Sequence, residues 1–366
     1  MLTDKRKWLT PVGVMAVGAA VVLVLLRMET AATAQVTGRV WGATALGTAI
    51  AWPAGFDAAA AVHRPAYSPS GRYLAFKHAQ EGRPMILELA TGELHGLYDL
   101  IGGVRPNLQC YEIVWLSDER LCVHETWMAE EDRQRLDELM EDPGFVPHMR
   151  TAMRARYRVI DWVARVTVFE RSVDTQQVAE LNLIAGYGDE LWIVSRAPSE
   201  PNWHSWWVYD PAKLEFVKPL VQRVRKGDWI GCGPRGPWAV KWLLPYPTPE
   251  IVLNVASYDV EFVNYETGQT RRLSQVLLRD PGGLFITGDG RYVVASFFDQ
   301  ATCRWAPAVF DTLSGQRHEL AATESWKPVA LNDARGVVLA YLPNQKPDGS
   351  WAVELSEIPL SQLLPQ

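Results

Sequence analysis

Histidine and acidic side chains are the groups of this sequence that could supply acid–base or metal chemistry. The seven histidines form no His-x-x-x-His pair, the spacing that places two imidazoles on one helix face for zinc. No Gly-x-Ser-x-Gly segment provides a nucleophilic serine. His124 is followed directly by Glu125 at the end of an expected strand, and we interpret this pair as a polar contact at the rim of a site. We therefore predict no catalytic residue, no metal and no cofactor, and a ligand contact for His124.

Aromatic side chains gather in segments that we expect to connect strands. Trp203 and Trp206 are three residues apart, Tyr246 lies among three prolines, and Trp305 occupies a third such segment. Exposed Trp and Tyr side chains bind sugar rings, peptides and protein partners. We therefore predict that Trp203, Trp206, Tyr246 and Trp305 contact a ligand.

The sequence has four cysteines, of which Cys110 and Cys122 flank a short turn. If Leu116 pairs with Leu121 across this turn, Cys110 faces Trp127. Cys122 lies five residues before Trp127 on that second strand, so its Cα would be roughly 17 Å from the position that faces Cys110. This is well beyond the limit of about 7 Å between the Cα atoms of a disulfide. We predict that these two thiols are unbridged and act as small buried hydrophobes.

A repeated turn-and-strand motif organises the chain that positions these residues. The clearest copies are Pro65–Phe76 and Thr287–Ser296, and each is followed by another strand and a second Gly-containing turn. The first turns fall at intervals of 48, 70, 46, 55 and 45 residues, near Gly71, Glu119, Asp189, Arg235, Gly290 and Arg335. Repeats of about 40–50 residues are typical of four-stranded propeller blades.

The motif resembles the TolB-type and WD-like propeller repeats, in which a Ser-Pro-Asp-Gly turn and an apolar strand precede a Thr-Gly turn. Ser68-Pro-Ser-Gly71 and Thr91-Gly92 carry the resemblance, which covers about residues 62–358. It implies an all-β, six-bladed β-propeller, with seven blades as the alternative if residues 36–60 form extra strands. A β-sandwich also has short strands and frequent turns, but six copies of one turn motif favour the propeller.

The last repeat holds strands around residues 328–331, 336–341 and 351–357, and little chain remains for a fourth. We expect Val36–Trp41 to supply the missing strand. Pairing of the two chain ends would close the ring and remove the exposed sheet edges.

The connections between second and third strands vary in length, whereas the first turns are short. Variable loops on a rigid scaffold are where binding usually happens, so we predict the binding face there. The longest connection is predicted to form a helical hairpin over 128–158, because Met149, Met153 and Tyr157 recur every four residues. Its first half is acidic and its second half is basic, so the hairpin either packs on the propeller or docks a partner.

The amino terminus predicts export. Residues 8–26 are 19 consecutive uncharged residues, nearly enough for a helix to cross a bilayer core of about 30 Å, and basic residues precede them. We predict a cytoplasmic tail at 1–7, a transmembrane anchor or signal segment at 8–26, a linker at 27–35 and an extracytoplasmic propeller at 36–366. The alternative is a secreted or periplasmic protein cleaved near Ala34.

Charge narrows the choice of partner. The net charge is -6, and because residues 1–35 carry +2, the exported part carries -8. An acidic protein of this kind is a poor match for nucleic acid. We predict a non-enzymatic binding or scaffold module for a protein, peptide or envelope polymer, with a protein, peptide or polysaccharide as the ligand on the variable-loop face. The alternative is a propeller enzyme acting on a sugar or peptide at the channel mouth.

Overall fold

The computed structural model divides the chain into two compact units, Met1–Leu46 and Gly47–Gln366. The described residues are 47–102, 108–128, 130–131, 153–173, 184–187, 190–196, 203–210, 215–225, 232–235, 238–243, 256–264, 266–278, 284–299, 304–319, 327–345, 349 and 351–364. The predicted tail at 1–7, anchor at 8–26, linker at 27–35 and strand at 36–41 lie outside them. Within the described residues, no helix is long and apolar enough to cross a membrane.

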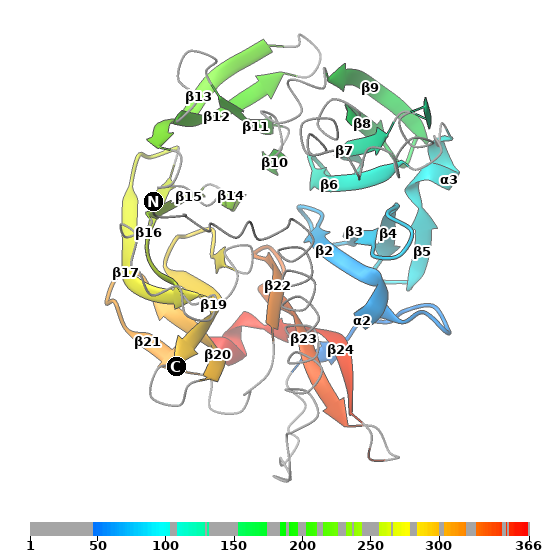
Figure 1. Cartoon of the computed structure of the whole chain (residues 1–366). Helices are drawn as coiled ribbons and strands as arrows, with labels where there is room; N and C mark the ends of the chain where they lie inside the picture. The colour runs from blue at the N-terminus through cyan, green and yellow to red at the C-terminus, as the bar shows by residue number, and fades with distance from the viewer. Residues whose placement is uncertain are drawn as a thin grey trace, which may run out of the picture. The chain divides into compact units, whose positions relative to one another are not determined.

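Antiparallel strands form most of the described part of Gly47–Gln366 (Figure 1). Three sheets are four-stranded and take their strands in chain order. The first contains β2 (Val62–Tyr67), β3 (Tyr73–His78), β4 (Pro84–Glu88) and β5 (Glu93–Gly96). The second contains β6 (Gln109–Trp115), β7 (Arg120–Met128), β8 (Met153–Asp161) and β9 (Val166–Val173). The third contains β10 (Ile184–Tyr187), β11 (Glu190–Arg196), β12 (Trp203–Asp210) and β13 (Glu215–Arg225).

The remaining strands form one eight-stranded and one four-stranded sheet. The larger sheet runs through β14 (Cys232–Arg235), β15 (Trp238–Leu243), β16 (Ala256–Asn264) and β17 (Thr270–Leu278), then β18 (Phe285–Ile286), β19 (Tyr292–Asp299), β20 (Arg304–Asp311) and β21 (Arg317–Glu319). A single pair, Leu278 opposite Phe297, joins its two halves. The last sheet has the order β1 (Thr48–Ala49), β24 (Trp351–Pro359), β23 (Val337–Gln345) and β22 (Lys327–Asn332). The short helices are α2 (Ala58–Ala61), α3 (Leu97–Ile101) and α8 (Leu360–Leu363).

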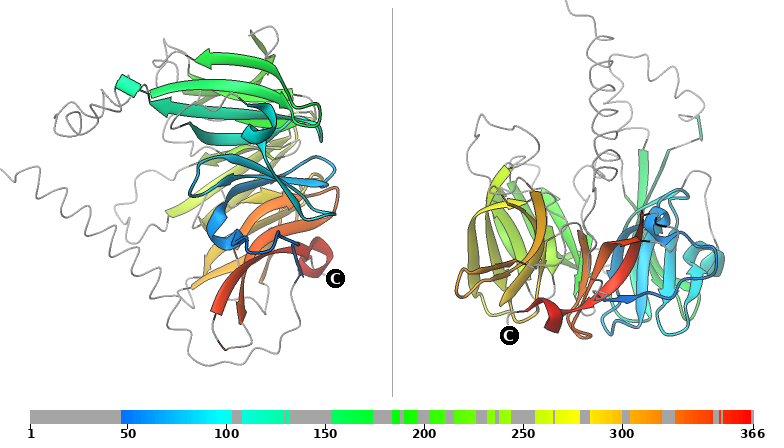
Figure 2. Two further views of the ribbon diagram at one scale, coloured as in Figure 1. Left: turned by 90° about the vertical axis from the view of Figure 1, so that its right-hand side faces the viewer. Right: turned by 90° about the horizontal axis from the view of Figure 1, so that it is seen from below.

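Each run of four strands places its first strand on the inner side of the arrangement, as β2, β6, β10 and β22 show in Figure 1. Inner strands contact one another from sheet to sheet, β2 with β6 and β22, and β10 with β6 and β14. The last sheet therefore lies beside the first one, which the further views in Figure 2 also show in red and blue.

The turns predicted from the repeats join the first and second strands of the runs. Gly71 and Gly290 have φ angles of 73° and 70°, which favour glycine because a side chain crowds the backbone there. In the same two runs, the backbone N–H groups of Leu89 and Thr312 donate to the carbonyls of Arg72 and Arg291, at 3.0 and 2.8 Å. The first and last turns of a run therefore lie on one side, which we call the turn face. The opposite side, where the first strands begin, is the connection face.

Neighbouring sheets are joined by polar contacts between their first turns. The N–H of Ser70 donates to the Asp118 carboxylate at 3.0 Å, and the N–H of Gly288 donates to Asp333. Between the last and first sheets, Asn332 Nδ2 donates to the carbonyl of Ser68 at 3.3 Å. The short polar turns thus connect sheets as well as strands.

An amino-terminal strand completes the last sheet, as predicted, but the predicted residues were wrong. Thr48 and Ala49 lie opposite Glu357 and Ser356 of β24, so Thr48–Ala49, rather than residues 36–41, supplies the fourth strand. Trp52 follows this strand and stacks on Phe56 with ring centroids 5.2 Å apart. The aromatic pair packs against the core between the first and last sheets.

The core lies between adjacent sheets. Tyr73, Ala75 and Ile86 of the first sheet pack with Leu121 and Ile160 of the second. Trp115 belongs to the same cluster, is buried as predicted, and donates its indole N–H to the carbonyl of Ala66 at 2.9 Å. Because a sheet packs against a neighbour on each face, its strands carry apolar side chains on both faces, and their sequences are continuous apolar runs.

The predicted helical hairpin over 128–158 is wrong at its carboxyl end. Residues 153–158 are the first two-thirds of β8, in register with β7 from Met128 opposite Met153 to Arg120 opposite Asp161. Residues 132–152 lie outside the described residues. The alternation of Ala155, Tyr157 and Val159 with arginines is the period of a strand, and all three apolar side chains are buried.

The predicted pairing around the cysteines was shifted by one residue. Trp115, rather than Leu116, lies opposite Leu121, and an irregularity at Tyr111 shifts the pairing again, so that Cys110 lies opposite Glu125 and not Trp127. Such a bulge inserts one extra residue into a strand and re-aims its neighbours. Cys110 and Cys122 are nevertheless free and buried, as expected.

Candidate functional site

Three of the four aromatic residues predicted to contact a ligand lie within the described residues. Trp203 and Trp206 lie on β12, and Trp305 lies on β20, each at or near the beginning of a third strand. We had expected Trp203 and Trp305 in the connections, but the strands begin before or at them. Tyr246 lies outside the described residues. Trp203 and Trp206 therefore share one strand, Trp305 belongs to another sheet, and their ligand contacts stay predictions.

His124 lies in the interior and not at a rim. Its side chain is 1% exposed, and neither ring nitrogen has a hydrogen-bond partner among the described residues. It stacks on Tyr157 with ring centroids 4.6 Å apart and meets the edge of Tyr111 at 5.4 Å. Burial lowers the pKa of His124 to about 4, because the charged imidazole loses its hydration. The ring is therefore neutral at physiological pH and carries unused hydrogen-bonding capacity.

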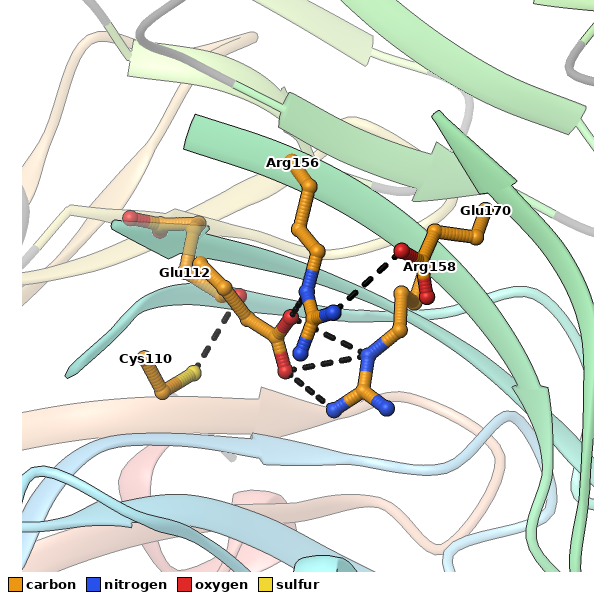
Figure 3. Close-up of polar contacts among 6 residues, drawn as sticks. Cys110, Glu112, Arg156, Arg158 and Glu170 are labelled. Atoms are coloured by element: carbon orange, nitrogen blue, oxygen red, sulfur yellow. Dashed lines mark hydrogen bonds and ion pairs between the residues drawn. The ribbon is translucent and has the colours of Figure 1, made fainter. Parts of the chain in front are cut away.

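Glu125, the next residue, points to the opposite face of β7 and belongs to a buried ionic network. Arg156 and Arg158 of β8 converge on its carboxylate (Figure 3). The Nε of Arg156 and the Nη2 of Arg158 each lie 2.5 Å from a carboxylate oxygen, and all three side chains are at most 4% exposed. Arg156 also donates to Glu170 at 3.2 Å. Two arginines thus face two carboxylates, and the network is neutral overall.

The network has apolar and thiol neighbours. The Arg158 guanidinium lies 5.3 Å from the ring centre of Tyr98, and that of Arg156 lies 5.7 Å from Trp127. Burial first, and then the negative charge of Glu125, raise the pKa values of the Tyr98 phenol and the Cys110 thiol. Both groups therefore stay protonated, and Cys110 is a poor nucleophile. These contacts extend the buried network from the second sheet to Tyr98 of α3.

The exposed end of this region is a contact between β2 and β6 on the connection face. Arg64 of β2 donates to the backbone carbonyl of Tyr111 at 3.3 Å and pairs with the Glu112 carboxylate. Its guanidinium lies 5.2 Å from the ring centre of Tyr111, whose side chain is 41% exposed. We call Arg64, Tyr111 and Glu112 the β2–β6 site. Since Tyr111 also contacts His124, the site reaches from solvent to the buried imidazole.

Backbone geometry turns Arg64 toward this site. Arg64 is one of the two described non-glycine residues with a positive φ, at 51°, and the register of β2 against β3 is irregular between His63 and Ala66. A residue held in this conformation costs about 1–2 kcal/mol, which other contacts must offset. The pairing with Tyr111 and Glu112 supplies such contacts.

Sequence reasoning missed the β2–β6 site. Arg64, which precedes a proline at the start of a repeat, and Tyr111 were not among the residues predicted to contact a ligand. The signal in the sequence was weak, because the two residues are 47 positions apart and meet only when two inner strands lie side by side. Among the described residues, no group of three or more His, Cys, Asp or Glu side chains could hold a metal ion.

Comparison with known proteins identifies the fold alone. No protein-family model and no curated protein matches the chain. Among solved structures, an acylaminoacyl peptidase from Pyrococcus horikoshii is 13% identical with a TM-score of 0.50, over 81% of this chain and 45% of that one. An oligogalacturonate lyase from Vibrio parahaemolyticus is 16% identical with a TM-score of 0.46, over 81% and 77%. The β-propeller domain of the Trilobed protease from Pyrococcus furiosus is 9% identical with a TM-score of 0.43, over 82% and 81%.

The likeness to the peptidase structure agrees with the strand order. The mostly β, propeller-like fold predicted from the repeats is confirmed at this level. The chain spans less than half the length of the peptidase, and the identities are too low to carry an activity from one protein to the other. The function must therefore be argued from the residues of the site.

Proposed function

We propose that this protein is a six-bladed, TolB-type β-propeller that binds a partner on its connection face without catalysing a reaction. In this proposal residues 8–26 anchor it in a membrane and the propeller is extracytoplasmic. Six turns, each between the first two strands of a run of four, support the blade count. The amino-terminal strand β1 would complete the sixth blade.

The observation that carries the binding proposal is the exposed pair of Arg64 and Tyr111. Large exposed aromatic side chains and arginines are the residue types that dominate binding energy at protein interfaces. Contact with Arg64 orders the Tyr111 ring before any partner arrives, so less side-chain entropy is lost on binding. The site also lies on the face where the connections between strands vary in length.

The neighbouring residues favour binding over catalysis. His124 and Glu125 are adjacent in sequence, but their side chains lie on opposite faces of β7 and are both buried. Glu125 is committed to two arginines, so the two residues do not form an acid–base pair. The alternative, an enzyme acting at the channel mouth, stays a prediction, and we assign no catalytic residue to it.

Cross-linking in the native membrane tests the binding proposal. The full chain is cross-linked, and the captured partner is identified by mass spectrometry and then quantified for variants. We expect Tyr111→Ala to reduce capture at least tenfold with little change in melting temperature, because Tyr111 is exposed. Leu313→Ala is the matched control, since Leu313 is 61% exposed in a turn on the turn face. Equal capture by wild type and Tyr111→Ala would overturn the proposal.

The anchor has its own test. An integral membrane segment resists extraction by alkaline carbonate, and an uncleaved chain keeps its first residue. We expect the full-length protein in the carbonate-resistant pellet. A mature amino terminus just after Ala34 would show instead that the segment is a cleaved signal.

A further inference from the structure

The imidazole of His124 has hydrogen-bonding groups that the fold does not use. Among the described residues, it is the histidine whose two ring nitrogens are both buried and without a hydrogen-bond partner. A neutral imidazole has one N–H donor and one lone-pair acceptor, and each loses water here without gaining a partner. Nearly all buried polar groups of folded proteins are satisfied, so this exception requires an explanation. A ligand group that hydrogen-bonds to the ring supplies one.

The Tyr111 ring connects this imidazole to the solvent. It is 41% exposed, and its edge meets His124 with ring centroids 5.4 Å apart. Tyr111 is the extra residue of β6, because the pairing with β7 shifts between Cys110 and Glu112. A bulged residue is left out of the regular ladder, so its side chain is aimed independently of its neighbours. The ring can turn its edge from the imidazole while its face keeps the contact with the Arg64 guanidinium.

The neighbours of His124 limit the kind of group that can reach it. The imidazole stacks on Tyr157, whose apolar cluster also contains Val114, Leu116, Cys122, Ala155 and Val159. Glu112 lies opposite His124 on β6 but is paired with Arg64. A charged ligand group would therefore lose its hydration here without a dedicated counter-charge. An uncharged hydroxyl can accept from the imidazole N–H or donate to the other ring nitrogen, so it suits this place.

The carrier of this hydroxyl is best an aromatic ring. Tyr111, His124 and Tyr157 already form a row of ring contacts, which another aromatic ring extends. A sugar carries several hydroxyls, but among these three rings only that of His124 has buried polar atoms without a partner. A phenol has one hydroxyl at the end of an apolar ring. We infer that a tyrosine side chain of a protein partner enters beside Tyr111 and hydrogen-bonds through its hydroxyl to the imidazole of His124. This inference rests on the proposed binding function.

NMR on the full-length chain in detergent tests the contact with p-cresol, the side-chain analogue of tyrosine. Toluene is the matched control, because it has the same ring and methyl group but no hydroxyl. The imidazole signals of His124 are assigned by their loss in His124→Phe. We expect p-cresol to shift these signals to saturation, with a dissociation constant about tenfold below that of toluene, the scale of one hydrogen bond to a buried group. Equal dissociation constants, or no shift with p-cresol, would overturn the inference.

Selection from a random dodecapeptide display library on the same protein tests whether a peptide supplies the ring. We expect the enriched peptides to share a tyrosine. Its replacement by phenylalanine should raise the dissociation constant, measured by fluorescence anisotropy, about tenfold for the wild type and leave it unchanged for His124→Phe. His95→Phe is the control, because His95 is a half-buried histidine of β5 in the first sheet and should respond as the wild type does.

The other outcomes separate this inference from the binding function. Enriched peptides without tyrosine that lose binding in Tyr111→Ala would contradict the tyrosine contact and leave the binding function intact. Peptides insensitive to Tyr111→Ala would contradict both proposals. Equal losses from the peptide change in wild type and His124→Phe would show that the hydroxyl binds another group. No enrichment, or binding of neutral oligosaccharides on a glycan array without peptide binding, would show that no tyrosine enters the site, and capture in the native membrane would still decide the binding function.

Discussion

Two neighbouring residues of β7 have different surroundings because their side chains lie on opposite faces of the strand. The sequence offered His124 and Glu125 as one polar pair, but successive side chains leave a strand on opposite sides, so the two residues have different neighbours. Glu125 meets two arginines, whereas His124 meets two tyrosine rings. The burial of Glu125 could not be predicted, because its partners Arg156 and Arg158 were assigned to the predicted helical hairpin.

Removing the charge of Glu125 should destabilise the protein strongly. Glu125→Gln leaves Arg156 and Arg158 buried without a full counter-charge, and breaking a buried pair from one side costs about 3–5 kcal/mol. Urea unfolding followed by tryptophan fluorescence measures the change. The control is Glu88→Gln, because Glu88 pairs with exposed Arg72 and solvent screens such a pair, so we expect only a small change in stability. Equal effects at both positions would show that the buried network is not a stabilising feature.

Stability should fall in acid because of His124. Its pKa is about 4 in the folded protein against about 6.5 when unfolded, so folding favours the neutral ring. Its contribution is complete above pH 6.5 and is lost as the pH falls from 6.5 to 4. At pH 4.5 the loss amounts to about 2–3 kcal/mol.

The variant His124→Phe isolates this contribution. It keeps a ring between Tyr111 and Tyr157 but has no proton to bind, so the free energy of unfolding should fall less between pH 7 and pH 4.5 than in the wild type. Urea titrations at both pH values measure the difference, and His95→Phe is the control because His95 is only half-buried. Parallel pH dependences of wild type and His124→Phe would contradict the assignment.

Among the elements, local signals were predictable and long-range pairing was not. The first turns were found because their glycines and polar caps are contiguous, and Gly71 and Gly290 adopt the positive φ that such turns need. β8 was misassigned because the spacing of Met149, Met153 and Tyr157 also matches a helix. The burial of Arg156 and Arg158 depends on Glu125, 31 and 33 residues earlier. Deleting Met128–Arg158 would therefore remove most of a core strand.

Two tryptophans separate binding from folding at the level of the strand. Trp115→Ala removes a buried ring and its hydrogen bond to Ala66, and should cost about 3–5 kcal/mol. Trp203→Ala, at the start of β12, should leave stability nearly unchanged and weaken capture of the cross-linked partner by about 2 kcal/mol. Melting temperature and capture are measured on both. A loss of stability at Trp203 equal to that at Trp115, with capture unchanged, would remove Trp203 from the binding face.

For the whole molecule, contacts between distant parts of the chain join the last sheet to the first. Tyr341 donates its hydroxyl to the carbonyl of Val62 at 2.7 Å, and Tyr67 donates to Glu357 at 2.8 Å. The sequence predicted that the amino terminus would complete the last sheet, because its final repeat lacked a strand. It did not predict which residues would do so, because β1 has only two residues and no apolar alternation to identify it.

Gly47 offers a test of this closure. Its φ is 87°, and a Cβ there would lie 2.4 Å from the backbone oxygen of Glu357, the residue that pairs with Thr48. Gly55 has a similar φ of 81° but open space around it, so Gly55→Ala adds only conformational strain, about 1–2 kcal/mol. Gly47→Ala adds a collision with backbone that no side-chain movement relieves, and should cost about 1–3 kcal/mol more. Thermal and urea unfolding of the two variants measure the difference. If they unfold alike, the pairing of β1 with β24 contributes little to stability, and the contacts of Tyr341 and Tyr67 join the last sheet to the first instead.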